Sequence, residues 1–173
     1  TIDYDEFGLF HENAAEFGLP FDGPPMVRRE SVEVRPGFRL SALVWGNRQP
    51  ELVLLHGGGQ NAHTWDTVAM ALGRPLIAID LPGHGMSDQP LGDLHGDAAH
   101  VAAAIERLGT DVVLVGHSYG GAVITEAAGR HPEVAHLVYL TAFALEAGES
   151  VMSLLTSLPR ADIALGRAIV PRD

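Results

Sequence analysis

Residues 112–127 have the sequence VVLVGHSYGGAVITEA, and this stretch decides what the rest of the chain must form. It opens with the apolar run Val112–Val115, three of whose residues are β-branched, which suits a strand buried on both faces. A turn with Ser118 at its apex follows, and a helix is predicted over residues 121–130. Glycines stand two positions away on each side because a Cβ there would make the strand and helix backbones collide. The stretch therefore predicts a nucleophilic serine, with a chance Gly-Ser-Gly turn as the alternative.

Composition sets the first limits on function. The 173 residues are 46% hydrophobic and 19% charged, which is enough for one modest domain with a core. The formal net charge of -11 and the lack of a basic stripe argue against a nucleic-acid partner, and solubility explains that charge more simply. The sequence has no cysteine, which excludes a disulfide framework and a thiol nucleophile.

The apolar runs in the chain are too short to cross a membrane. The sequence does not begin with a charged segment followed by an apolar one, which is the pattern of a signal peptide. We therefore expect no membrane span and a cytoplasmic location. No pair of histidines has metal-ligand spacing supported by a third ligand, so we predict no metal and no cofactor.

Two alternating segments come first in the predicted sheet. Residues 1–26 form an N-terminal arm in which a short helix is expected around Asn13 to Phe17, with a mobile arm as the alternative. Residues 27–34 and 39–45 then alternate in hydropathy around the turn Pro36-Gly37, which predicts a hairpin. A hairpin ahead of continuous apolar strands predicts an antiparallel edge on a parallel sheet.

Buried strands and helices alternate through the rest of the core. This order predicts βαβ units with right-handed crossovers, and so an α/β fold with a mostly parallel sheet. From Ala144 the pattern changes to amphipathic helical spacing at 151–158, and a second short helix is expected within 163–169. Besides residues 112–115, the predicted buried strands are 51–55, 75–81 and 134–143, and the predicted helices between them are 62–72 and 93–108.

A glycine turn, His56-Gly57-Gly58-Gly59, follows the first buried strand, where open α/β sheets place their ligand sites. A phosphate-binding loop is the competing interpretation, but neither G-x-x-x-x-G-K-[ST] nor G-x-G-x-x-G occurs. Together with GHSYGG, this turn resembles the oxyanion loop of the α/β-hydrolase superfamily. Residues 80–88, DLPGHGMSD, resemble the D-x-x-G-x-G-x-S segment of that superfamily, and Trp65 stands where many members keep an aromatic residue. The resemblance is to serine esterase-like and lipase-like members and covers about residues 27–143.

The resemblance implies a set of roles. Ser118 would be the nucleophile, and the backbone amides of Gly58 and Tyr119 would form the oxyanion hole. His56, His84 and His117 fall inside the motifs, where they would be structural or loop residues and not the catalytic base. The candidate substrate-binding residues are Gly57, Trp65 and His117, although core packing explains Trp65 equally well.

The substrate class follows from the nucleophile. A serine in place of aspartate implies acyl transfer on esters, thioesters or amides, and argues against the dehalogenases and epoxide hydrolases of the superfamily. Residues 144–173 resemble the beginning of the helical cap that complete members insert at this point.

The catalytic acid and base of the superfamily do not appear in the expected order. The triad runs Ser, then Asp or Glu, then His, but no histidine follows His136, and position 141 is threonine. Three explanations stand: a part of a longer hydrolase, complementation by another copy or a second chain, or a non-catalytic descendant that binds a ligand. Without later strands, residues 134–143 would form an apolar sheet edge that favours self-association.

We expect a serine hydrolase that acts on a small carboxylic ester through an acyl-enzyme, with its acid and base supplied outside residues 1–173. The alternative is a ligand-binding or partner-complemented protein on the same scaffold. Fold alone does not identify the substrate.

Overall fold

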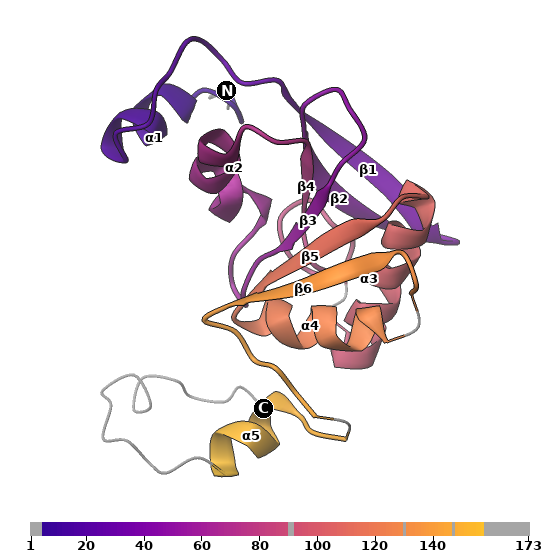
Figure 1. The fold of residues 1–173 in the computed structure, drawn as a ribbon. Coiled ribbons are helices and arrows are strands. Elements are labelled where there is room, and N and C mark those ends of the chain that lie inside the picture. The colour runs from indigo at the N-terminus through magenta and orange to yellow at the C-terminus, as the bar shows by residue number, and fades with distance from the viewer. Residues whose placement is uncertain (1–4, 90–91, 130, 147, 158–173) are drawn as a thin grey trace.

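A six-stranded sheet with strand order β1-β2-β4-β3-β5-β6 forms the centre of the computed structural model, which describes residues 5–89, 92–129, 131–146 and 148–157 (Figure 1). β1 pairs antiparallel with β2, and β2 antiparallel with β4, while β3, β4, β5 and β6 run parallel to one another. The predicted antiparallel hairpin on a parallel sheet is therefore confirmed. The strands are β1 (Val27–Arg35), β2 (Phe38–Trp45), β3 (Leu52–Leu55), β4 (Leu76–Ile79), β5 (Val112–His117) and β6 (Val134–Leu140).

The helices lie close to their predicted positions. The N-terminal helix begins earlier than expected, at Phe10, and the segment predicted over 62–72 is a 3₁₀ turn that continues as an α-helix. The side chain of Asp93 caps the longest helix by accepting a hydrogen bond from the Gly96 amide at 2.8 Å, and Gly109 ends it at φ 60°. The helices are α1 (Phe10–Glu16), η1 (Ala62–Trp65), α2 (Asp66–Leu72), α3 (Leu94–Leu108), α4 (Tyr119–Ala128) and α5 (Val151–Ser157).

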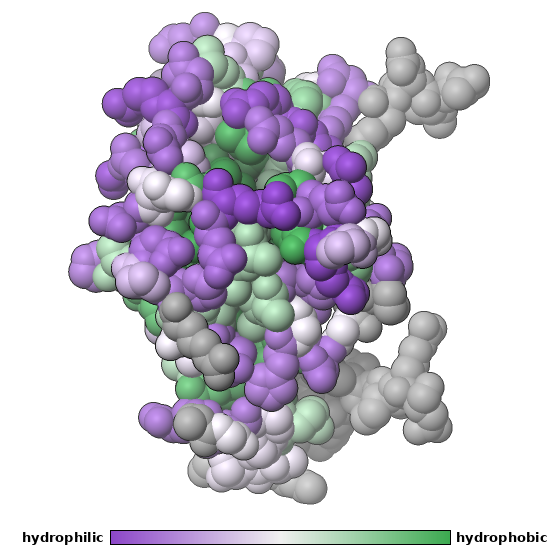
Figure 2. Space-filling model, turned by 90° about the vertical axis from the view of Figure 1, so that its right-hand side faces the viewer, coloured by the Kyte–Doolittle hydropathy of each residue, from purple (hydrophilic) through white to green (hydrophobic). Residues whose placement is uncertain are grey.

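Helices cover both faces of the sheet (Figure 1). One face packs on α3 and α4 through residues such as Val101, Ile105 and Ile124. The other face packs on α1, η1 and α2, where the ring of Phe10 meets Trp45 edge-on with centroids 5.3 Å apart. Strands buried on both faces need continuous apolar sequences, which explains the runs in β3 and β5. On the side of the molecule in Figure 2, hydrophilic residues predominate and hydrophobic ones are visible between them.

Strand β6 differs from its prediction as a buried strand over 134–143. It ends at Leu140, and its side chains are half-buried or exposed, with Val138 39% and Leu140 42% exposed. The reason is its position: β6 is last in the sheet order and, within the described residues, pairs only with β5. The backbone then turns at Thr141, which has φ 42°.

The helix predicted at 151–158 is present as α5 (Val151–Ser157), but none of its residues is buried. Met152 and Leu155 project into solvent. The second short helix, expected within 163–169, lies outside the described residues. In the ranges that the structure describes, no helix has the length and apolar character needed to span a bilayer.

Candidate active site

The serine turn has the strained geometry that its glycines predicted. Ser118 joins β5 to α4 at φ 52° and ψ -118°, a conformation that L-residues rarely adopt. A Cβ placed on Gly116 would lie 2.5 Å from the carbonyl oxygen of Gly120, and one on Gly120 would lie 2.5 Å from that of Leu55. Both glycines are therefore required by close backbone approach.

The glycine turn after β3 lies against this serine. Leu55 pairs with Gly116 in the parallel register of β3 and β5, so both strands deliver their following loops to the same edge of the sheet. A Cβ on Gly57 would lie 3.0 Å from Ser118 Cβ, which shows how closely the two segments approach. The two motifs thus form one cluster at the carboxyl ends of the parallel strands.

Three consecutive amides in the glycine turn have different partners. The Gly57 amide donates to Gln60 Oε1 at 2.9 Å, and the Gly59 amide donates to His84 Nε2 at 3.2 Å. The Gly58 amide has no hydrogen-bond partner among the described residues. The hydrogen bonds of the Gly57 and Gly59 amides hold the turn, and the Gly58 amide between them is free to donate to a ligand.

A second free donor comes from the serine turn itself. Tyr119 is the first residue of α4, so its amide has no acceptor within the helix, and no partner is found for it in the described part of the chain. Helix N-termini also carry partial positive charge. Two unpaired amides, one from each segment, therefore accompany Ser118, an arrangement that can stabilise a developing oxyanion.

Buried His56 connects the glycine turn to the residues that follow β4. Its Nδ1 lies 2.7 Å from the carbonyl oxygen of Gly57, and its Nε2 accepts a hydrogen bond from the Leu81 amide at 3.0 Å. The ring must therefore be neutral with the proton on Nδ1. Burial lowers the pKa of His56 and favours this same neutral form.

The other two motif histidines also contact the turn. His117 Nδ1 lies 3.0 Å from Gln60 Oε1, which already accepts from Gly57, so His117 donates through Nδ1. His84 accepts from Gly59 through Nε2, and its Nδ1 lies 3.0 Å from the carbonyl oxygen of Pro82. Both contacts support the structural role that the family resemblance implied.

A buried carboxylate explains the D-x-x-G-x-G-x-S segment. Asp80 is fully buried, and its Oδ1 accepts from the Ala62 amide at 2.7 Å, which fixes the start of η1. Its Oδ2 accepts from the Met86 amide at 3.1 Å and from Arg29 Nη1 at 2.7 Å. A Cβ at Gly85, which has φ 51°, would overlap this carboxylate. The segment therefore ties β1, β4 and η1 together beside the glycine turn.

Arg29 extends this network to the N-terminal arm. It also pairs with Glu6, whose Oε1 lies 3.1 Å from His63 Nε2. The hydrogen bond from His63 Nδ1 to Asp66 Oδ2, 2.7 Å long, raises the pKa of His63, and Glu6 reinforces the shift. Burial raises the pKa of Asp66, but two carboxylates facing both ring nitrogens favour the imidazolium form of His63.

Tyr119 is also held through its side chain. Its hydroxyl donates to Asp97 Oδ2 at 2.8 Å, which links α4 to α3. Burial raises the pKa of both groups, and the hydrogen bond to Asp97 adds to the shift of Tyr119. Asp97 is 3% exposed, and among the residues that the structure describes its Oδ1 has no hydrogen-bond partner. This bond restrains the residue whose amide stands beside Ser118.

The family model for alpha/beta hydrolases matches residues 52–172. The chain belongs to the alpha/beta hydrolase family. It is 55% identical over 84 residues to the esterase Rv0045c of Mycobacterium tuberculosis, an alignment that covers 48% of this chain and 26% of the esterase. A solved structure of that esterase superposes with a TM-score of 0.72 at 36% identity, and the match covers 90% of this chain and 50% of the esterase chain.

A further relative is a pimeloyl-[acyl-carrier protein] methyl ester esterase of Neisseria meningitidis. It is 38% identical over 97 residues, which cover 53% of this chain and 30% of the relative. This alpha/beta hydrolase chain thus spans half or less of the length of the relatives it matches.

Most predicted site residues of this chain gather in one cluster. Ser118, Gly57, Gly58, Tyr119 and His117 lie where β3 and β5 end. Trp65 does not join them, because it is 3% exposed and packs in the core between the sheet and α2. Its position supports core packing and gives the substrate-binding prediction no support.

Other residues of the cluster escaped prediction from sequence. Gln60, Asp97 and Arg29 act through partners between 3 and 57 positions away, and no local motif marks them. Within the described residues, no histidine nitrogen hydrogen-bonds to Ser118, and no group of three or more His, Asp or Glu side chains is arranged to hold a metal ion.

Proposed function

We propose that this chain provides the nucleophile and the oxyanion hole of a serine hydrolase that cleaves small carboxylic esters through an acyl-enzyme. The observation that carries the proposal is the strained Ser118 beside two unpaired backbone amides, those of Gly58 and Tyr119. The esterase activity named for two relatives supports the same substrate class.

The reaction begins when Ser118 Oγ attacks the ester carbonyl carbon. The carbonyl oxygen becomes an oxyanion that the amides of Gly58 and Tyr119 bind, and loss of one such donor costs about 10²–10³ in rate in other hydrolases. Collapse of the intermediate expels the alcohol and leaves an ester on Ser118. Water then attacks this ester, which releases the acid and restores the serine.

Each half-reaction needs a base and an acid for its protons. We assign these roles to an Asp/Glu–His pair outside residues 1–173, because no histidine follows His136 in the sequence. His56 is committed to two backbone contacts, and His117 donates to Gln60, so neither serves as the base in this proposal.

The same lack of a base supports a second candidate function. A chain that is not complemented by an acid and a base would bind an ester-like or acid-like ligand at this cluster without cleaving it. An unactivated serine is a weak nucleophile, so such a protein would react poorly with phosphonates.

Intact-mass spectrometry with a fluorophosphonate, performed on the full-length protein, distinguishes the two functions. We expect one adduct, hydrolysis of 4-nitrophenyl acetate, and loss of both in Ser118→Ala with unchanged thermal unfolding. Ser153→Ala, an exposed serine of α5, is the matched control and should keep both. Labelling that persists in Ser118→Ala would refute the nucleophile, and a folded protein with neither adduct nor hydrolysis would favour the binding function.

A further inference from the structure

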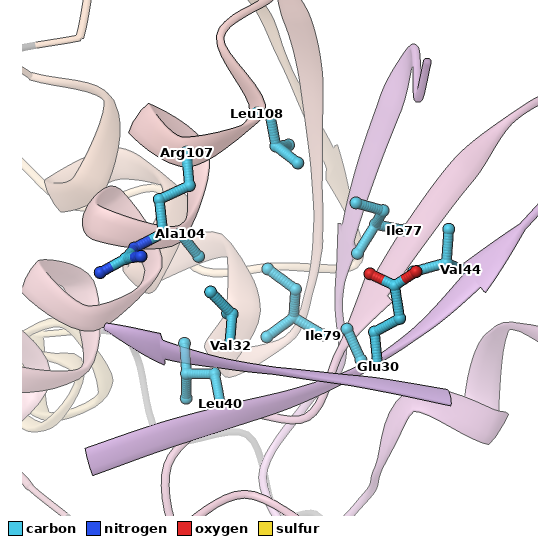
Figure 3. A pocket seen from close by; sticks show the side chains of 10 residues that line it. Glu30, Val32, Leu40, Val44, Ile77, Ile79, Ala104, Arg107 and Leu108 are labelled. Carbon is cyan, nitrogen blue, oxygen red and sulfur yellow. The ribbon is translucent and has the colours of Figure 1, made fainter. Parts of the chain in front are cut away.

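A cavity away from Ser118 lies between the sheet and the end of α3 (Figure 3). Its volume is about 200 Å³, and its walls come from β1, β2, β4 and α3. The apolar side chains that line it include Val32, Leu40, Ile77, Ile79, Ala104 and Leu108. Several of them are only partly buried although they pack against the main core, so they leave apolar surface facing the cavity.

This cavity is separate from the cluster around Ser118. Helix α3 runs back along the sheet, and its end lies by the start of β3, because Gln49 Nε2 donates to the Leu108 carbonyl oxygen at 3.0 Å. Ser118, in contrast, follows the carboxyl end of β5. None of the residues that line the cavity belongs to the glycine turn or the serine turn.

Two charged side chains accompany the apolar walls, and they differ in how their charges are neutralised. The carboxylate of Glu30 accepts a hydrogen bond from Arg28 Nε at 2.6 Å. Arg107 makes no ion pair within the described ranges of the chain. In Figure 3, the guanidinium of Arg107 and the carboxylate of Glu30 lie on different sides of the apolar group. The cavity therefore combines apolar walls with one uncompensated positive charge.

We propose that this cavity binds an aliphatic monocarboxylate, whose alkyl chain packs on Val32, Ile79 and Leu108 and whose carboxylate bonds to Arg107. A guanidinium matches a carboxylate geometrically through two parallel N–H donors. The apolar walls offer few partners for the hydroxyls of a sugar or a nucleoside, which such ligands require. At the far end Arg28 already pairs with Glu30, so a second carboxylate would gain no free cation there, which disfavours dicarboxylates.

The site goes beyond the proposed esterase function and does not depend on it. Its ligand belongs to the chemical class of the acid that ester hydrolysis would release, but binding needs neither Ser118 nor a catalytic base. Affinity should rise about fourfold for each methylene added from butanoate to octanoate, until the cavity is filled.

The test is calorimetric titration of the full-length protein with octanoate, and of three variants. Arg107→Gln should weaken binding at least tenfold without changing thermal unfolding, because the side chain is exposed and unpaired. Arg48→Gln, an exposed arginine away from the cavity, is the control and should bind as the wild type does. Ala104→Leu fills the cavity and should abolish binding, with circular dichroism to confirm folding.

Two further controls concern the charge of the ligand and the location at which octanoate binds. Octylamine should fail to bind, since it places a second cation at Arg107. Equal octanoate affinity in wild type and Arg107→Gln would overturn the proposal, because binding would then occur elsewhere, including at Ser118. No octanoate binding by the wild type would also overturn it, as expected if another segment of the chain fills the cavity. Both readouts stand whether or not the protein hydrolyses esters.

Discussion

Two regions of the molecule are stabilised very differently. One is the set of loops that follow β3, β4 and β5, and the other is the strand β6. Around Ser118, the side chains of Gln60, His84 and Asp80 accept hydrogen bonds from individual backbone amides, and two amides have no partner among the described residues. In β6, alternate side chains face solvent, and the following helix α5 buries none of its residues. Within the described residues, side-chain hydrogen bonds therefore fix the loops around Ser118, whereas β6 and α5 leave most of their side chains exposed.

The largest loss of stability is expected when a methyl group is added to Gly120 in the serine turn. Gly120→Ala should prevent correct folding, with a loss of about 3 kcal/mol or more, because its Cβ would lie 2.5 Å from the carbonyl oxygen of Leu55, the last residue of β3. Gly58→Ala is the matched control, since a Cβ there meets nothing within 4 Å. Urea unfolding of both variants measures the difference, and a stable Gly120→Ala protein would refute the close packing of the turn.

Two neighbouring arginines on β1 provide the next test. Arg29→Met leaves the fully buried Asp80 without its cation and should cost about 3 kcal/mol. Arg28→Met removes an exposed pair with Glu30 and an exposed hydrogen bond to the Gly46 carbonyl oxygen, and should cost about 1 kcal/mol or less. Chemical denaturation compares the two free energies of unfolding. Equal values would mean that the Asp80 network does not stabilise the loops as described.

Stability should depend on pH through His63, which pairs with Glu6 of the N-terminal arm and with Asp66. Because the pKa of His63 is raised above its usual 6.5, its contribution is fully present below that value and is lost as pH rises through the higher folded-state pKa. His63→Gln should therefore reduce the free energy of unfolding, measured by chemical denaturation, by up to about 1 kcal/mol more at about pH 6 than at about pH 9. A constant difference across this range would show that the pairing with Glu6 and Asp66 does not form.

The smallest effect is expected on β6. Val138→Lys and Leu140→Lys should change the unfolding free energy of residues 1–173 by less than about 0.5 kcal/mol, because both side chains are already exposed. The same substitutions should reduce self-association of this segment in light scattering, because edge lysines oppose strand pairing. A large loss of stability would mean that β6 is covered in solution.

Local patterns predicted much of the fold. Apolar runs, the hairpin turn and the glycines around Ser118 placed every described strand to within a few residues, because these features depend on neighbours in sequence. The same patterns placed Ser118, Gly57 and Gly58 in loops at the ends of two strands that proved to be adjacent.

Burial of β6 and the contacts of Trp65 could not be predicted in this way. The apolar run 134–143 looks like a central strand, but its exposure depends on what lies beyond it in the sheet. An aromatic residue near a loop suits a binding site or a core equally well, and Trp65 belongs to the core because it packs in one buried cluster with residues of the sheet, α1 and α2. The pairing of Arg29 with Asp80 joins residues 51 positions apart, for which a single sequence carries no signal.

Gly58 differs from both neighbouring glycines of the turn: a side chain at Gly57 would meet close contacts, and Gly59 has φ 73°, which L-residues rarely adopt. A Cβ at Gly57 would press on Ser118, Gln60 and His117, but one at Gly58 has open space, and its backbone φ suits any L-residue. Since only its amide serves the proposed hole, the side chain there is available for variation. If the proposed function holds, position 58 is therefore a place where a designed library can vary the side chain beside Ser118 without disturbing the fold of the turn.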